Sequence, residues 1–185
     1  MTVLNDREIA ALATDEHMIS PFADYDTDTA GRVSYGLTSF GYDIRVANEW
    51  ACYNGDAPLD LKDPTTLSVD RYEADQVVIH PGEMILCRSV ERFRMPATVV
   101  ATVIGKSSYA RLGLLVNVTP LEPGWHGTIT IELSNVGHRP IVVHANEGIA
   151  QVQFHTGARP DRIYSEKKTA KYQGQTEVTL PKVQQ

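Results

Sequence analysis

Two short stretches between residues 105 and 135 concentrate the side chains that could do chemistry. The first, GKSSYARLG at 105–113, follows an apolar run, so a single helical turn after a strand is expected there. Unpaired backbone N–H groups at the start of such a turn, with Lys106 and two hydroxyls, could cradle phosphate oxygens. Ser107 and Arg111 lie four residues apart and would share one face. The stretch therefore predicts an anion-binding turn.

Two alternatives are open for this turn. The letters GKS match the last three positions of a Walker A phosphate loop, but the residue five before Gly105 is Val100 rather than glycine, so the motif fails. A turn whose serines and lysine only cap and solvate the chain is the commoner structure for such a stretch on its own.

The second stretch, GTITIELSN at 127–135, alternates apolar and polar residues as a half-buried strand does. Its three aliphatic residues fall on one face. Glu132 falls on the other, with Thr128, Thr130 and Ser134. A carboxylate on a hydroxyl-lined face could relay protons, whereas an isolated glutamate on a sheet more often faces solvent. The neighbouring anion-binding turn favours the chemical interpretation.

Zinc chemistry is not expected. Zinc-dependent base deaminases carry an H-x-E triplet and a P-C-x-x-C motif to hold the metal, and neither is present. The histidines show no ligand spacing and are interpreted as surface or hydrogen-bonded residues; they lie at positions 17, 80, 126, 138, 144 and 155. Cys52 and Cys87 form no CxxC pair and are expected to be reduced, half-buried thiols.

Composition bounds the class of protein. The 185 residues, 42% hydrophobic and 22% charged, fit one compact domain with a real core. The chain has no apolar stretch long enough to span a membrane and no basic-then-apolar N-terminus, so a cytoplasmic protein without membrane contact is expected. The formal net charge of −6 disfavours a nucleic-acid polymer as partner. A small anionic ligand needs only a local pocket and stays compatible.

The rest of the chain predicts the scaffold. Asn5 followed three residues later by Glu8 indicates the start of a short N-terminal helix, and residues 20–34 read as a surface loop. Short β-type runs then follow, which indicates an antiparallel sandwich or barrel. The runs are 42–46, 76–79, 83–89, 98–104, 114–118, 128–133, 141–144 and 149–154, with a turn at 80–83. Beyond Phe154 the chain is too polar for core and is expected to be a mobile tail or a flap that orders on a ligand.

Four blocks in this order resemble the deoxycytidine-triphosphate (dCTP) deaminase family. They are residues 39–46 (SFGYDIRV), 105–135, 146–152 (NEGIAQV) and 171–175 (KYQGQ), and together they cover most of the chain from Ser34 onward. The resemblance implies a mainly β fold, a distorted antiparallel β-barrel or jelly roll of the dUTPase-like type with a short N-terminal helix and a few short helices. It also implies a homotrimer with active sites between subunits.

The resemblance implies roles for matching positions. Glu132 falls where the family has its catalytic carboxylate, and Ser107 and Arg111 lie beside the reacting carbon of the base. The nucleotide-binding helix, which contacts triphosphate and sugar, matches Lys106, Ser107, Ser108, Tyr109, Ala110 and Arg111. The backbone of Thr130 and Ile131 lines the cytosine pocket. Further ligand contacts match Gln151, Tyr164, Lys171 and Gln175, the last three on a C-terminal segment, about residues 157–185, that folds over the triphosphate.

One loop departs from the family. Many relatives have an Asp before the Pro-Gly-Trp turn in a longer loop, where this chain has TPLEPGW at 119–125. Glu122 is the candidate to replace that Asp in holding the deoxyribose 3′-hydroxyl. The Asp also helps to activate the water that attacks phosphate in the related triphosphatases and in bifunctional deaminases. Its replacement therefore favours deamination alone.

The expected activity is hydrolysis of dCTP to dUTP and ammonia in pyrimidine deoxynucleotide synthesis, with Glu132 as general base and then general acid. The resemblance implies Mg²⁺ bound through the triphosphate, no protein metal site and dTTP as a feedback inhibitor. Two alternatives are open: a bifunctional enzyme that releases dUMP and pyrophosphate, and a non-catalytic trimer that senses nucleotides.

Overall fold

The computed structural model describes residues 1–25 and 30–183 of the chain. The fold is mainly β, as expected, and its strands pair antiparallel. The described residues form two short α-helices, α1 (Asp6–Asp15) and α2 (Ser107–Ala110), and two 3₁₀ turns, η1 (Pro64–Thr66) and η2 (Tyr164–Glu166). The strands are β1 (Thr2–Val3), β2 (Ile19–Ser20), β3 (Gly36–Thr38), β4 (Gly41–Tyr53), β5 (Val69–Glu73), β6 (Gln76–Ile79), β7 (Met84–Arg94), β8 (Val99–Gly105), β9 (Leu114–Asn117), β10 (His126–Asn135), β11 (Ile141–His144) and β12 (Gly148–Thr156).

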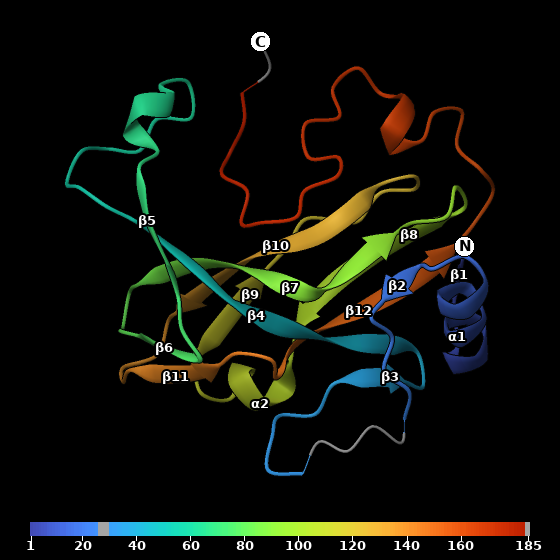
Figure 1. Ribbon diagram of the computed structural model, residues 1–185, viewed down its shortest axis with the longest axis horizontal. Coiled ribbons are helices and arrows are strands. Elements are labelled where there is room, and N and C mark those ends of the chain that lie inside the picture. Colours follow the sequence, from blue (N-terminus) through green and yellow to red (C-terminus); the bar gives the residue numbers. More distant parts are fainter. Residues whose placement is uncertain (26–29, 184–185) are drawn as a thin grey trace.

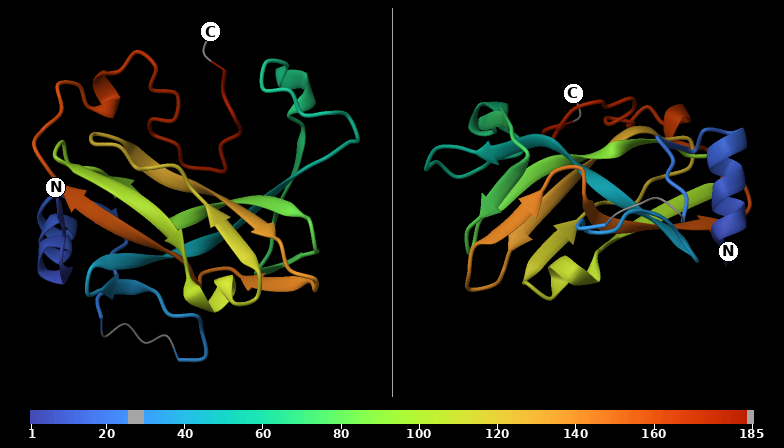
Figure 2. Two further views of the ribbon diagram at one scale, coloured as in Figure 1. Left: turned by 180° about the vertical axis from the view of Figure 1, so that it is seen from behind. Right: turned by 60° about the horizontal axis from the view of Figure 1, so that its bottom comes forward.

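The main sheet curls until its two sides meet. Its hydrogen-bonded order runs β8-β12-β4-β7-β10-β9, so β8 and β9 stand at opposite ends of that path. Ala101 on β8 nevertheless pairs with Leu121, just beyond β9, through backbone hydrogen bonds of 3.0 and 2.9 Å. Figures 1 and 2 show the strands crossing in two layers. The sequence predicted a sandwich or a barrel, and the structure is a curled half-barrel whose two sides meet at this bridge.

The core fills the space between the two layers. Trp50, Tyr42, Phe93 and Phe154 are fully buried there. The helix α1 begins with the predicted capping box: Glu8 N donates to Asn5 Oδ1 (3.1 Å) and Asn5 N donates to Glu8 Oε2 (2.9 Å). Because these bonds satisfy backbone groups that a helix leaves unpaired, α1 begins at a defined residue beside the sheet.

All eight predicted strands are present, most with shifted or extended ends, but four others were not predicted. Three of these, β1, β2 and β3, are only two or three residues long, too short for an alternation to show. The fourth, β5, reads VDRYE and has no buried residue. Ser20, placed in a loop, pairs with Arg92 of β7, and part of that loop, residues 26–29, lies outside the described residues.

Two expectations about burial were wrong. Cys87 is fully buried rather than half-buried, and Cys52 is half-buried and free. The C-terminal segment, residues 157–183, was expected to be too polar for core, yet Val178 is fully buried against Ala51 and Leu86. Leu180 of the same segment packs against this small cluster as well, so apolar side chains help to hold the segment on the sheet. The described part of the chain contains no helix long and apolar enough to cross a membrane.

Candidate active site

A pocket of about 520 Å³ lies between β10 and the C-terminal segment. β10 contributes its floor, and five residues of the C-terminal segment form part of its wall. Trp125 and three tyrosines give it an aromatic lining. Five predicted site residues line it: Glu122, Thr130, Glu132, Tyr164 and Gln175. The pocket therefore has the size and the mixture of apolar walls and few polar groups typical of a small-molecule site.

Glu132 occupies a half-buried position in this pocket. It stands opposite Asn117 in the β10–β9 ladder, and Asn117 Nδ2 donates to Glu132 Oε2 over 3.0 Å. Loss of solvent raises the pKa of Glu132 above its ordinary value of 4.5, and the hydrogen bond from Asn117 acts in the opposite direction. A carboxyl group whose pKa is raised holds a proton more readily than an ordinary glutamate, which suits a group that accepts and returns protons.

The face of β10 that carries Glu132 departs from the predicted alternation near its start. A register shift between Thr128 and Thr130 interrupts the alternation, and Thr128 is buried, not exposed on the polar face. Ile131 is fully buried, so its side chain packs in the core and its backbone is the part left to face a ligand. The predicted strand is correct, and the bulge is the feature that sequence alternation could not reveal.

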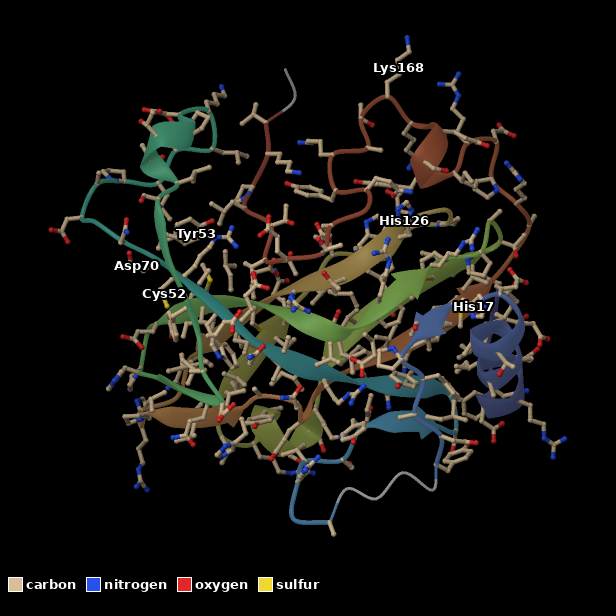
Figure 3. The ribbon with its side chains drawn as sticks, in the orientation of Figure 1. His17, Cys52, Tyr53, Asp70, His126 and Lys168 are labelled. Atoms are coloured by element: carbon tan, nitrogen blue, oxygen red, sulfur yellow. The ribbon has the colours of Figure 1, made fainter. Side chains whose placement is uncertain are left out.

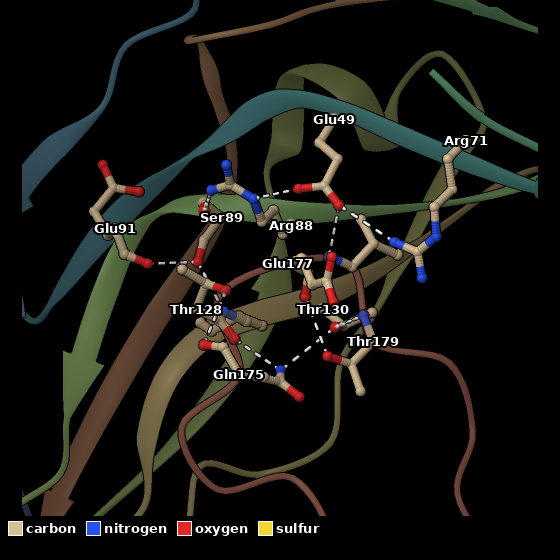
Figure 4. A network of polar contacts seen from close by, with 12 residues as sticks. Glu49, Arg71, Arg88, Ser89, Glu91, Thr128, Thr130, Gln175, Glu177 and Thr179 are labelled. Atoms are coloured by element: carbon tan, nitrogen blue, oxygen red, sulfur yellow. Dashed lines mark hydrogen bonds and ion pairs between the residues drawn. The ribbon is translucent and has the colours of Figure 1, made fainter. Parts of the chain in front are cut away.

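The C-terminal segment is hydrogen-bonded along β10. Gln175 Nε2 donates to Thr128 O over 2.7 Å, Thr128 N donates to Gln175 O over 2.9 Å, and Thr179 N donates to Thr130 Oγ1 over 3.2 Å. Figure 4 shows these contacts together. A Cβ at Gly127, whose φ is +148°, would lie 2.9 Å from Gln175 O. Only a glycine there lets the segment approach so closely.

The other predicted ligand contacts in and near the segment are engaged with protein groups in the structure. Glu122 forms an ion pair with Lys167, and Tyr164 Oη accepts from Tyr172 N over 3.1 Å. Lys171 is half-buried, its Nζ donates to Lys182 O over 2.9 Å, and it does not line the pocket. In Figure 3, Lys168 points away from the body of the molecule. Within one chain, Lys167 thus reaches the pocket residue Glu122, whereas Lys168 and Lys171 do not line the pocket.

The turn predicted to bind phosphate is present as α2, but it lies elsewhere. Ser107, Ser108, Ala110 and Arg111 are exposed. Arg111 Nη1 donates to the carbonyl of Ser107 over 3.1 Å. Tyr109 is buried in the core, so a ligand could reach only its backbone. None of these residues lines the pocket. In Figure 1, α2 and the C-terminal segment lie at opposite ends of the molecule.

A second polar cluster lies beside α2. Lys106 forms an ion pair with the buried Asp43, and Gln151 Nε2 donates to Asp43 Oδ1 over 3.2 Å and to Thr38 Oγ1 over 3.4 Å. Gln151 thus belongs with the turn and not with Glu132. The chain brings the predicted site residues together as two groups, one around Glu132 and one around α2.

Sequence reasoning missed four residues of these groups. Asp43 and Tyr172 lie inside the blocks SFGYDIRV and KYQGQ, so their place in those blocks was the available signal. Trp125 donates its Nε1 to Tyr172 O over 2.8 Å and ties the β9–β10 loop to the segment. Asn117 had no signal in its own spacing, because its role depends on the register between β9 and β10.

Comparison with known proteins gives concordant matches. A family model described as dCTP deaminase-like matches residues 3–157. The dCTP deaminase of Herpetosiphon aurantiacus is 46% identical over 186 residues, 99% of this chain and 100% of its own, and that of Chloroflexus aggregans is 45% identical over 185 residues, 99% of each. The 2′-deoxycytidine 5′-triphosphate deaminase of Agrobacterium tumefaciens has a similar fold, with a TM-score of 0.64 and 21% identity, over 84% of this chain and 48% of that one.

Proposed function

The chain belongs to the dCTP deaminase family and is a hydrolytic deaminase of dCTP, and we propose that Glu132 relays the protons of its reaction. The observation that carries this proposal is the position of Glu132: half-buried, in a pocket with aromatic walls, with a pKa raised by loss of solvent. Binding alone would not require such a group, because a carboxylate repels a nucleotide's phosphates.

In the proposed mechanism, Glu132 accepts a proton from water as the water oxygen bonds to C4 of the pyrimidine. It passes that proton to N3, which gives a tetrahedral intermediate. Glu132 then takes the proton of the new hydroxyl and delivers it to the departing amino group, so that the C4–N bond breaks, ammonia leaves and the C4 carbonyl forms. The hydrogen bond from Asn117 to Oε2 leaves Oε1 for this exchange. Ser107 positions the water and Arg111 stabilises the charge that develops.

We place the complete site between subunits of a homotrimer. Within one chain, Glu132 and α2 lie in separate groups, so α2 of a neighbouring subunit would supply Ser107 and Arg111 to the pocket. Three large aliphatic side chains around α2 are exposed by more than half and support a covered surface there: Ile104, Leu112 and Leu115. The adjoining Lys106 and Gln151 would bind the nucleotide from that same neighbour.

The C-terminal segment is proposed as the flap of a single domain spanning residues 1–185. On this proposal Tyr164 and Gln175 contact the nucleotide from inside the pocket, and Lys171 turns from Lys182 O to the triphosphate when substrate binds. Glu122 would exchange its ion pair with Lys167 for the deoxyribose 3′-hydroxyl. Thr130 and Ile131 would meet the cytosine through their backbone.

Magnesium would enter this site with the substrate. Mg²⁺ prefers oxygen ligands and keeps several from phosphates and water, so a triphosphate can supply most of them. Glu122 and Glu132 are the carboxylates that line the pocket, which fits a metal held mainly by the nucleotide. When bound, the ion neutralises phosphate charge. Inhibition by dTTP and a cytoplasmic location stay predictions.

The direct test is product analysis. Purified protein is incubated with dCTP and Mg²⁺, and nucleotides, ammonia and pyrophosphate are measured. Equal amounts of dUTP and ammonia are expected. Release of dUMP and pyrophosphate would instead identify a bifunctional enzyme, and tight binding of dCTP without any product would identify a nucleotide sensor.

A further inference from the structure

A charged cluster outside the pocket contacts the C-terminal segment. Glu49 on β4 accepts from Arg88 Nε through Oε2 (2.6 Å) and from Arg71 Nη1 through Oε1 (3.4 Å). The same Oε1 accepts the backbone N–H of Val178 over 2.9 Å. Figure 4 shows that Glu49 lies between the two arginines and the segment. Two cations thus orient a carboxylate whose remaining contact is a backbone donor of the segment.

The charged cluster around Glu49 is preorganised and is not an incidental surface contact. The side chain of Glu49 is 18% exposed, and that of Arg88 is 25% exposed. A hydrogen bond between a backbone N–H and a partly buried carboxylate is stronger than one between neutral groups. The arginines come from β5 and β7, so the contacts that orient the carboxylate do not involve the segment.

Val178 fills an apolar seat beside this carboxylate. Its side chain is fully buried against Ala51 of β4 and Leu86 of β7, in a small cluster separate from the main core. Tyr53 packs against the same cluster. Leu86 and Tyr53 also line the pocket, so the seat and the pocket share a wall. Docking of Val178 therefore fixes the segment directly next to the site.

The pocket depends on that docking. Four of its lining residues, Tyr172, Gln175, Thr179 and Pro181, belong to the segment near Val178. If the segment lifted, the pocket would lose this wall and admit water, and Thr130 Oγ1 would lose its two donors, Gln175 Nε2 and Thr179 N. Glu49 itself does not line the pocket.

We propose that Glu49 and Val178 form a latch that holds the C-terminal segment closed over the pocket. Glu49 is then a positioning residue for turnover, although it touches neither the pocket nor the reacting atoms. This inference rests on the proposed function for its kinetic consequence, but not for the docking itself. The apparent affinity for a substrate that needs the closed segment falls in proportion as the fraction of closed molecules falls.

The test uses two variants and two matched controls in the full-length chain. Glu49→Gln removes the latch charge, and Glu73→Gln removes a charge from the residue that faces it in the β4–β5 ladder. Val178→Ala empties the seat, and Val183→Ala shortens an exposed valine of the same segment. Tryptic cleavage after Lys171 and Lys182, measured without nucleotide, reports release of the segment. Steady-state kinetics with dCTP report its consequence.

For Val178→Ala and Glu49→Gln, cleavage should accelerate and KM for dCTP should rise, each by about tenfold, with a smaller change in kcat. The two controls should match wild type, and Val178→Ile, which keeps the seat filled, should restore slow cleavage. Cleavage at the wild-type rate in both latch variants would overturn the latch. Faster cleavage with KM unchanged would overturn the role of Glu49 as a positioning residue for turnover. If wild type yields no dUTP, the proposed function fails, and the cleavage rates alone decide whether the latch exists.

Discussion

The surroundings of Glu132 and those of α2 differ in how complete they are within one chain. Glu132 has an oriented hydrogen bond from Asn117, a pocket around it and a segment docked over it. Ser107 and Arg111 are exposed, and Arg111 contacts the carbonyl of its own turn. Preorganised groups are typical of the place where chemistry occurs. This difference supports the proposal that the chain supplies a proton relay at one end and, at the other, a binding turn for a site that another subunit completes.

The largest effect should come from the relay itself. Glu132→Gln keeps the size of the side chain and its hydrogen bond with Asn117 but cannot exchange protons, so kcat should fall by at least ~10³ while dCTP still binds. Ammonia release and equilibrium binding are the measurements. Glu83→Gln, in the turn before β7, is the matched control. Turnover within a few-fold of wild type would remove Glu132 from the mechanism.

A smaller loss is expected at the binding turn. Arg111→Ala should lower kcat/KM by about 10², since a cation near the developing charge stabilises the transition state. The effect should shrink as salt rises, because salt screens an exposed charge. Arg139→Ala, in the exposed turn before β11, controls for loss of a surface arginine. If both variants behave alike, α2 takes no part in the site.

Asn117 provides a finer test of the relay. Its hydrogen bond lowers the pKa of Glu132 against the larger effect of lost solvent, so Asn117→Ala should raise that pKa further. The general base must be ionised, and the acid limb of the kcat/KM profile should therefore move to higher pH. Asn54→Ala removes a comparable amide-to-carboxylate bond, to Asp70; neither residue lines the pocket, so this variant should leave the profile unchanged. If the acid limb of the kcat/KM profile does not move in Asn117→Ala, ionisation of Glu132 does not set that pH dependence.

The smallest effect concerns stability. A carboxyl group whose pKa is raised by folding binds protons more tightly in the folded state, so its ionisation costs stability as pH rises through the interval above 4.5. Glu132→Gln should therefore melt at a higher temperature than wild type at neutral pH, and the difference should vanish below pH 4.5. Thermal unfolding at both pH values is the measurement. A variant less stable than wild type at neutral pH would contradict the desolvation of Glu132.

The sequence predicted what depends on local pattern. The alternation around Glu132 predicted β10, and the residues before the first helix predicted its capping box. It missed β5, whose exposed polar residues are held by pairing with β4 and not by burial. It also missed the seat of Val178, because one valine in a polar stretch has no periodicity and its burial depends on distant residues of β4 and β7.

For the candidate site, too, residue identities could be predicted from the sequence, whereas their arrangement in space could not. Identities such as Glu132 and Arg111 followed from residue type and resemblance, whereas their separation into two groups is a property of the curled sheet. The pairing of Gln151 with Asp43, and of Glu49 with the backbone of Val178, joins residues 108 and 129 positions apart. Contacts over such distances along the chain are set by topology, which spacing does not encode.

The central claim is that Glu132 of one subunit works with α2 of another, and mixing two inactive variants tests it most directly. Glu132→Gln and Arg111→Ala chains carrying different tags are co-expressed, and oligomers that bear both tags are purified. In a trimer that bears both tags, one of the three shared sites keeps both groups intact, so about a third of wild-type dCTP deamination should return. Mixed oligomers that stay as inactive as their parents would contradict the shared site.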